Sequence, residues 1–214
     1  MTPRTLAVAL ASLVGLMALA SPAEASTIAY SETFTGSGTL GSLGAFTNAT
    51  VTLTGLGDTT NVLGTPGNAD ITLAPGAATV TVSTLSGSAT FTDTILVVTT
   101  NPIAPLGEAD FIDNTLPFVT IAGTVNSLLF NYDLKTLIGP IVNSQTSVGA
   151  TGMNYGTSVG DLSFTSITAS TETFRAFIPT SVPEPASVVM ITTGLAWVGL
   201  AVYRTRSRRQ PAGA

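Results

Sequence analysis

The chain has 214 residues, of which only 9% are charged, and it contains neither cysteine nor histidine. These absences exclude disulfide bonds, cysteine nucleophiles, imidazole bases and the metal sites that such ligands build. Twelve acidic residues stand against seven basic ones, a balance that disfavours binding to nucleic acid.

The first residues have the pattern of a secretory signal peptide. One basic residue, Arg4, precedes an uncharged apolar run over residues 6–20, and the small side chains of Ala23 and Ala25 follow. Small residues suit the narrow subsites of a signal peptidase, which predicts cleavage before Ser26. Residues 1–25 are therefore expected to be removed on export. The alternative is an uncleaved membrane anchor, for which the apolar run is short.

Residues 26–178 are predicted to form one exported domain of short β-strands. In residues 49–55 and 78–85, valine or leucine alternates with threonine, so one face of each strand is apolar and the other carries hydroxyls. Turn-forming residues separate the strand patterns, and no stretch has a sustained helical period. We expect an all-β fold, a β-sandwich of the jelly-roll or immunoglobulin-like kind. Further strands are predicted at residues 27–34, 70–74, 88–100, 117–123, 127–134, 161–170 and 171–178.

The exported domain is strongly acidic, with ten acidic residues against Lys135 and Arg175, a net charge of −8. Its densest acidic stretch is loop-like and contains Glu108, Asp110 and Asp113. Carboxylates this close together could hold Ca²⁺, which accepts oxygen ligands in flexible geometry. The spacing matches no helix-loop-helix calcium pattern, and a solvated polar loop is the simpler interpretation. No other cofactor is expected.

The domain is predicted to be non-enzymatic. Serine and threonine are abundant but have no histidine base, and Lys135, the only lysine, has no serine motif beside it. A pair of carboxyl groups could in principle hydrolyse a glycosidic bond, although their separation cannot be read from the sequence. A glycan-binding or Ca²⁺-binding surface module and an exported hydrolase are the alternatives.

The C-terminal region has three parts in succession. Residues 179–185 form a proline-rich tether, and residues 186–203 are uncharged and apolar, long enough for a helix of roughly 27 Å that could cross a thin bilayer. Residues 204–214 form a basic tail. Basic residues that flank a span stay in the cytoplasm, so this tail is expected inside and the domain outside. The stop-transfer cluster consists of Arg204, Arg206, Arg208 and Arg209.

This order of motif, apolar span and arginine cluster, from Val182 to Arg209, resembles the PEP-CTERM sorting signal of Gram-negative bacteria. In that comparison Pro183, Glu184 and Pro185 would be the recognition motif. The resemblance implies export, anchoring in the inner membrane on the periplasmic side and processing near the motif by an exosortase, after which the protein reaches the cell surface or the extracellular matrix. Such proteins are associated with exopolysaccharide and biofilm. The expected partners are therefore signal peptidase, an exosortase, the inner membrane and exopolysaccharide.

The resemblance covers about one eighth of the chain and implies no activity for residues 26–178. A non-enzymatic structural or adhesive protein of the cell surface or matrix best fits this β-rich sequence, which is rich in Ser, Thr and Gly and has few charged residues.

Overall fold

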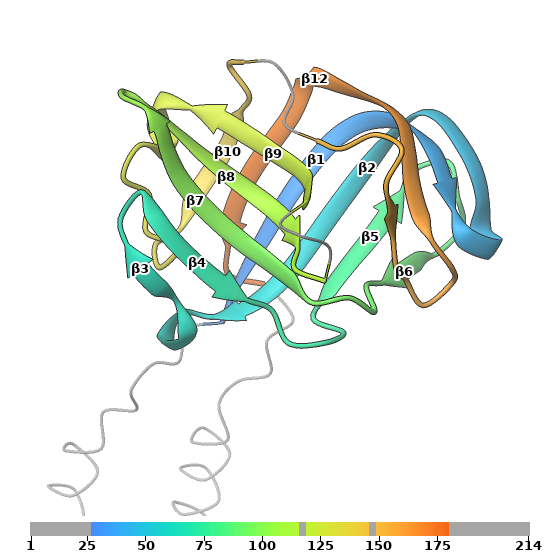
Figure 1. Cartoon of the computed structure of the whole chain (residues 1–214), viewed down its shortest axis with the longest axis horizontal. Helices are drawn as coiled ribbons and strands as arrows, with labels where there is room; N and C mark the ends of the chain where they lie inside the picture. Colours follow the sequence, from blue (N-terminus) through green and yellow to red (C-terminus); the bar gives the residue numbers. More distant parts are fainter. Residues whose placement is uncertain (1–26, 116–118, 146–148, 180–214) are drawn as a thin grey trace, which may run out of the picture. The chain divides into compact units, whose positions relative to one another are not determined.

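The computed structural model describes residues 27–115, 119–145 and 149–179 (Figure 1). All of the strands that the structure describes belong to one compact unit, Met1–Ile178. The signal peptide, the sorting motif, the apolar run of residues 186–203 and the basic tail predicted from the sequence lie outside the described residues. Within the described ranges, no helix has the length and apolar character that a membrane span requires.

The strands form two antiparallel sheets, which confirms the all-β prediction. The first sheet has the order β10 (Ile138–Val142), β12 (Leu162–Phe177), β1 (Thr27–Leu40), β2 (Gly44–Asp58), β5 (Ala78–Val82) and β6 (Ser88–Thr90), and β11 (Asn154–Tyr155) pairs with β12. The second sheet has the order β3 (Leu63–Thr65), β4 (Asn68–Thr72), β7 (Ile95–Ile103), β8 (Leu106–Asp113) and β9 (Val119–Asn126). The described residues also contain three short 3-10 helices, η1 (Gly41–Leu43), η2 (Thr59–Asn61) and η3 (Ser127–Leu129).

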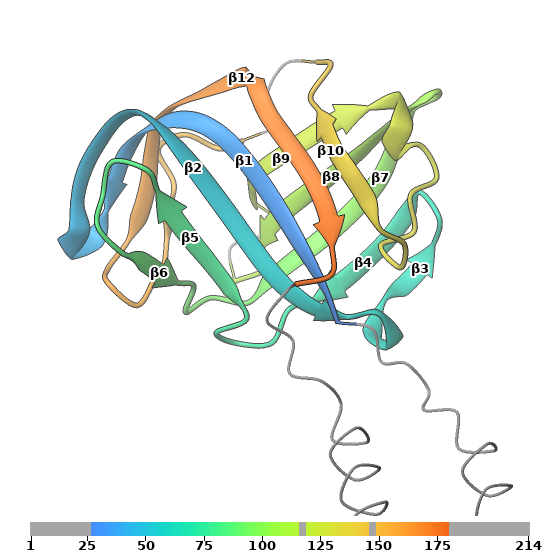
Figure 2. The ribbon, with the colours of Figure 1, turned by 180° about the vertical axis from the view of Figure 1, so that it is seen from behind.

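The two sheets share one hydrophobic core. The second sheet lies nearer the viewer in Figure 1, and the first sheet lies nearer in Figure 2. Side chains alternate along each strand, so Tyr30 and Phe34 of β1 enter the core while Thr33 and Thr35 remain partly exposed on the outer face. The large buried side chains come from both sheets, among them Phe111 of β8. Burial of this apolar surface is the main stabilising contribution to the fold.

The first and last strands of the domain lie side by side. β1 and β12 are paired along most of their length. Ala29 pairs with Phe177 at one end, and Leu40 pairs with Leu162 at the other. Residues 35–40 of a glycine-rich segment continue β1 directly up to η1. Gly38 allows this pairing because a Cβ there would lie 2.0 Å from the carbonyl oxygen of Ser163.

Several local predictions were wrong. Residues 127–134, predicted as a strand, form η3 and a turn, because the Asn126 side chain caps η3 by accepting a hydrogen bond from Leu128 N and because Asn131 and Leu134 have positive φ. Residues 161–178, predicted as two strands, form the single strand β12. The expected strand of residues 88–100 breaks between β6 and β7.

The acidic stretch of residues 107–114 is also not a loop. Its residues up to Asp113 belong to β8, which is paired along its length with β7 and β9. Its backbone groups are therefore satisfied by the ladder, and the acidic side chains are carried into the folded domain.

Candidate functional site

The three acidic residues predicted as a Ca²⁺ group all lie on β8, but they do not point the same way. Glu108 and Asp110 are two positions apart in an unbroken ladder with β7, so their side chains lie on one side of the strand. Asp113 projects to the other side, ~10 Å along the strand from Asp110. Thr115 donates two hydrogen bonds to the Asp113 carboxylate, one from its backbone nitrogen over 2.8 Å and one from its hydroxyl. The structure thus brings Glu108 and Asp110 together and places Asp113 at a turn.

Two carboxylates of the first sheet point into the core between the sheets. Glu32 of β1 lies opposite Phe174 of β12, and Glu172 precedes Phe174 by two positions. Glu32 shares the inner face of β1 with Tyr30 and Phe34. Both glutamates are 0% exposed. Each occupies a core position where the alternating pattern would ordinarily place an apolar residue.

Polar side chains hold these glutamates between the sheets. The hydroxyl of Thr124, on β9, donates to Oε1 of Glu32 over 2.6 Å. Asn143, which follows β10, donates its side-chain amide to Oε2 of Glu172 and accepts a hydrogen bond from the backbone nitrogen of Val125 over 3.2 Å. Hydrogen bonds therefore link the first sheet to β9 of the second. We refer to the following four residues as the polar seam: Glu32, Thr124, Asn143 and Glu172. Asp110 pairs with Gly123 and lies on the face of the second sheet opposite Thr124.

Burial and neighbouring acids disfavour the charged forms of Glu32 and Asp110. Burial raises the pKa of Glu32 well above its usual value; the hydrogen bond from Thr124 lowers this pKa, and the negative charges of Glu172 and Asp110 raise it. Burial also raises the pKa of Asp110, and Glu108 and Glu172 raise it further. The charged side chains that raise these two pKa values, among them Glu172, are all acidic.

One buried oxygen of Glu32 and one of Asp110 accept no hydrogen bond from the described residues. They are Oε2 of Glu32 and Oδ1 of Asp110, which is 5% exposed. The Asp110 oxygen lies against Gly123 of β9, where a Cβ would approach it to 1.7 Å. A buried carboxylate oxygen without a partner costs free energy unless it carries a proton or has a positively charged neighbour.

Within residues 27–115, 119–145 and 149–179, no group of three or more His, Cys, Asp or Glu side chains is already assembled around one point for a metal ion. The Ca²⁺ prediction therefore stays a prediction. Glu108 lies closest to the solvent among these acids: it is only partly buried, and its Oε2 accepts a hydrogen bond from the Thr100 hydroxyl over 3.1 Å.

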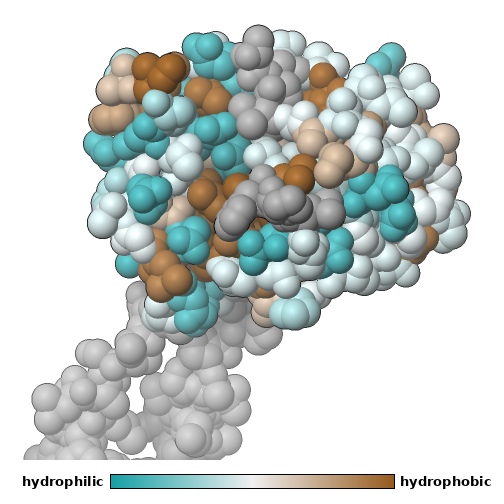
Figure 3. Space-filling view, in the orientation of Figure 1, coloured by the Kyte–Doolittle hydropathy of each residue, from teal (hydrophilic) through white to brown (hydrophobic). Residues whose placement is uncertain are grey.

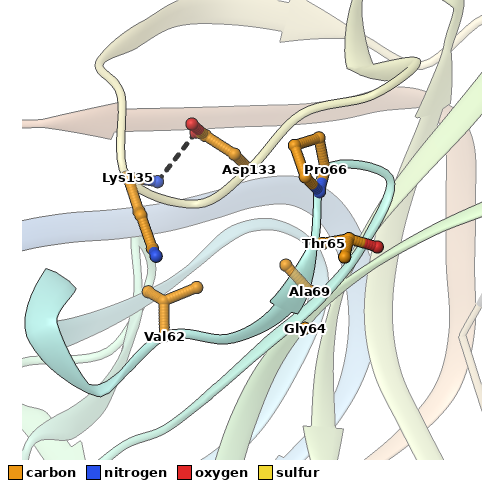
Figure 4. A pocket seen from close by; sticks show the side chains of 7 residues that line it. All are labelled: Val62, Gly64, Thr65, Pro66, Ala69, Asp133 and Lys135. Carbon is orange, nitrogen blue, oxygen red and sulfur yellow. Dashed lines mark hydrogen bonds between the residues drawn. The ribbon is translucent and has the colours of Figure 1, made fainter.

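A separate pocket of about 140 Å³ lies between the β3–β4 region and the turn that follows η3 (Figure 4). The side chain of Lys135 extends beside Val62, and Oδ1 of Asp133 accepts a hydrogen bond from the backbone nitrogen of Lys135 over 2.9 Å. Thr65 supplies a hydroxyl to the lining. The pocket offers polar groups to a small molecule. Its lining has one carboxyl group, Asp133, whereas glycoside hydrolysis uses a pair.

The residues predicted for processing and sorting lie outside the described residues, so the structure assigns them no geometry. They are Ala23, Ala25, Ser26, Pro183, Glu184, Pro185, Arg204, Arg206, Arg208 and Arg209.

The sequence analysis missed Glu32 and Glu172, although each carries a detectable signal. Glu32 interrupts the alternation of Ile28, Tyr30 and Phe34, and Glu172 precedes Phe174 in the same way. An acidic residue at an inward position of a strand indicates a buried carboxylate. That the two belong to one group could not be read from a sequence in which 140 positions separate them.

Comparison with protein-family models, with curated proteins and with solved structures found no match to this chain.

Proposed function

We propose that this protein is an exported, non-enzymatic component of the cell surface or extracellular matrix, sorted and processed at its Pro-Glu-Pro motif by an exosortase. The observation that carries the proposal is the order of that motif, the apolar run and the arginine cluster from Val182 to Arg209. The prolines keep the backbone extended, which leaves the motif open to an enzyme at the membrane face.

The extent of the folded domain supports this division of the chain. The strands begin at Thr27 and end at Phe177. Cleavage before Ser26 or near Pro183 would remove no strand residue. The domain could therefore be released with both sheets complete.

We further propose that the domain is a β-sandwich of the jelly-roll or immunoglobulin-like kind, and that it contacts exopolysaccharide. Two antiparallel sheets around one core support the sandwich. The outer face of the first sheet supports the contact: Thr173, Thr33, Thr52 and Thr81 lie in one row across four strands. Their hydroxyls suit hydrogen bonding to a neutral, hydroxylated polymer. Figure 3 shows the opposite face, where apolar groups are scattered among polar ones.

The test is the intact mass of the protein from strains with and without the exosortase. We expect the processed form to lack the peptide that contains Trp197 only when the enzyme is present. Replacement of Glu184 by alanine should preserve the unprocessed mass, whereas the matched change Ser181→Ala should not. If Trp197 persists equally in both strains, the sorting proposal is wrong.

A further inference from the structure

We propose that one end of the first sheet is a docking surface for the phospholipid headgroups of the membrane that holds the chain. This inference rests on the proposed anchoring through residues 186–203, and it adds a membrane contact made by the folded domain itself. The docking surface consists of six apolar or basic residues: Leu56, Lys135, Leu137, Arg175, Phe177 and Ile178.

The docking surface is built on an apolar row across the outer face of the first sheet. Leu56 of β2 pairs with Ala29 of β1, which in turn pairs with Phe177 of β12. Three neighbouring strands therefore present these side chains in line. Leu137 continues the row, because the adjoining Ile138 pairs with β12. Leu56 is 45% exposed and Leu137 is 54% exposed, so the row gains free energy if another apolar surface covers it.

Both basic side chains of the described residues lie at this end of the sheet. Arg175 is exposed two positions before Phe177, and its guanidinium lies 4.4 Å from the centre of the Phe177 ring. Lys135 is exposed two positions before Leu137, and Figure 4 shows its side chain beside Val62. A surface that combines cations with apolar groups suits the headgroup region of an anionic membrane.

The distribution of charge distinguishes this end from the rest of the domain. Residues 26–178 have ten acids and a net charge of −8. Two of the acids, Asp58 and Asp133, lie near the docking surface and are balanced by Lys135 and Arg175. The other acids lie in the core, on β4 and β8, and before β7 and β12. An anionic lipid surface would therefore repel the remainder of the domain but not this end.

The length of chain beyond the domain favours lipid as the occupant. Figure 2 shows that β12 ends beside the start of β1. Ile178, which is 60% exposed, follows β12 and is the last residue of the compact unit, and the apolar run begins at Ala186. The intervening residues can span at most about 30 Å. The docking surface therefore stays within short reach of the membrane whenever the run is inserted, and at such an effective concentration weak contacts suffice.

The experiment measures how close two labelled positions lie to the lipid. The chain is purified in mild detergent from a strain without the exosortase. It is then placed, one copy per disc, in nanodiscs of equal parts phosphatidylcholine and phosphatidylglycerol. Because the chain has no cysteine, a fluorophore can be attached at Gly139→Cys, beside the docking surface, where a Cβ would meet nothing within 4 Å. The matched label is at Ser42→Cys, exposed in η1 beyond the far end of β1.

A lipid with a nitroxide on its headgroup quenches fluorophores that lie near the membrane surface. We expect quenching to be several times stronger at Gly139 than at Ser42. Leu137→Ser should lower the ratio of docked to undocked chains about fivefold, because roughly half of a leucine side chain no longer gains from burial. The matched control, Leu128→Ser, changes a residue of η3 that is 66% exposed and should leave the quenching unchanged.

The basic residues are tested by changing the lipid as well as the protein. Lys135→Gln and Arg175→Gln should each lower the ratio of docked to undocked chains about fivefold in the anionic discs. In discs of phosphatidylcholine alone, neither substitution should have an effect. Equal effects in the two kinds of disc would show that the charges do not act through the lipid, which contradicts the docking surface as proposed.

Equal quenching at Gly139 and Ser42 overturns the inference, and this result needs no substitution within the docking surface. If Gly139 is shielded from a water-soluble quencher only in discs that hold two copies, a second chain and not lipid covers the surface, and the inference is wrong. Flotation with vesicles of the same lipids in alkaline carbonate tests the anchor separately. A chain that floats but shows equal quenching contradicts the docking alone. A chain that carbonate extracts contradicts the proposed anchoring, and the docking inference falls with it.

Discussion

The two ends of the shared core are built on different chemistry. At one end Phe164 of β12 packs edge-on against Phe34 and Phe46, with ring centres 5.4 and 6.2 Å away, and lies 6.3 Å from the ring of Tyr155. We call these four residues the aromatic cluster. Nearer the other end of the same strand, Glu172 lies in the polar seam. One sheet pair is thus held by apolar burial at one end and by hydrogen-bonded carboxylates at the other.

Because of this difference, we expect the two ends of the core to respond differently to ions and pH. Apolar contacts are insensitive to ions and pH near neutrality, and they tolerate small changes of geometry. The seam is stable only if its charge is neutralised and its hydrogen bonds are complete. We therefore expect the aromatic cluster to provide stability under all conditions, and the seam to make stability depend on conditions.

The largest effect should come from alkaline pH, which acts at both ends. Burial raises the pKa of the Tyr155 phenol to about 12, with a smaller contribution from Asp113, and burial also raises the pKa of Tyr30 and Tyr132. The unfolded chain releases these protons near pH 10, before the native state does. Stability is therefore complete below about pH 10 and is lost as pH rises toward the native pKa values.

In a Tyr203→Phe background, tyrosinate absorbance should rise together with the loss of the β signal in circular dichroism. Phenols that ionise near pH 10 while both sheets persist would contradict this.

Removal of the central ring of the aromatic cluster should be next in size. Phe164→Ala deletes a fully buried ring that contacts three others, and we expect a loss of ~3–5 kcal/mol in the free energy of unfolding. Urea denaturation measures this loss. The exposed neighbour Thr165→Ala is the control, with a change within ~0.5 kcal/mol. A loss below ~1 kcal/mol for Phe164→Ala would mean that the cluster is not a main source of stability.

A smaller loss is expected in the seam. Thr124→Val keeps the shape of the side chain but removes the hydroxyl that donates to Glu32, leaving a buried acceptor unpaired. We expect ~1–3 kcal/mol of destabilisation. Thr81→Val, at an exposed position on the outer face, should change stability by less than ~0.5 kcal/mol. Equal effects of the two substitutions in urea denaturation would show that the seam hydrogen bond contributes nothing specific.

The smallest effect tests the place of Asp110. In Gly123→Ala the new methyl would meet Oδ1 of Asp110, the end of a side chain that can rotate, so we expect ~1 kcal/mol of destabilisation. In a double-mutant cycle with Asp110→Ala this loss should disappear. Gly139→Ala, which has nothing within 4 Å of the added Cβ, is the control. Additive losses for Gly123→Ala and Asp110→Ala would place the carboxylate elsewhere.

The alternation of apolar and polar residues predicted the strands best where it was most regular. Alternation of valine or leucine with threonine in residues 49–55 and 78–85 corresponds to β2 and β5, which pair with each other. It failed at residues 127–134, where the Asn126 cap and the positive φ of Leu134 override an apolar run. Turn chemistry of this kind depends on a few backbone angles that alternation does not report.

The same limit applies to the site. The sequence of residues 107–114 predicted a polar loop, because acidic side chains are rare in buried strands. Pairing with β7 and β9 makes this segment a strand, and Asp110 lies against Gly123 of β9. No local feature of the segment indicates those neighbours.

The amino-acid sequence alone was sufficient for the all-β class, because side-chain alternation and turn residues act over a few positions. It was also sufficient to exclude thiol and imidazole chemistry, because the residues are absent. The grouping of Glu32, Thr124, Asn143 and Glu172 was decided only by the tertiary structure. These residues are far apart in the chain, and they come together because β12 returns beside β1 while β9 closes over the same core.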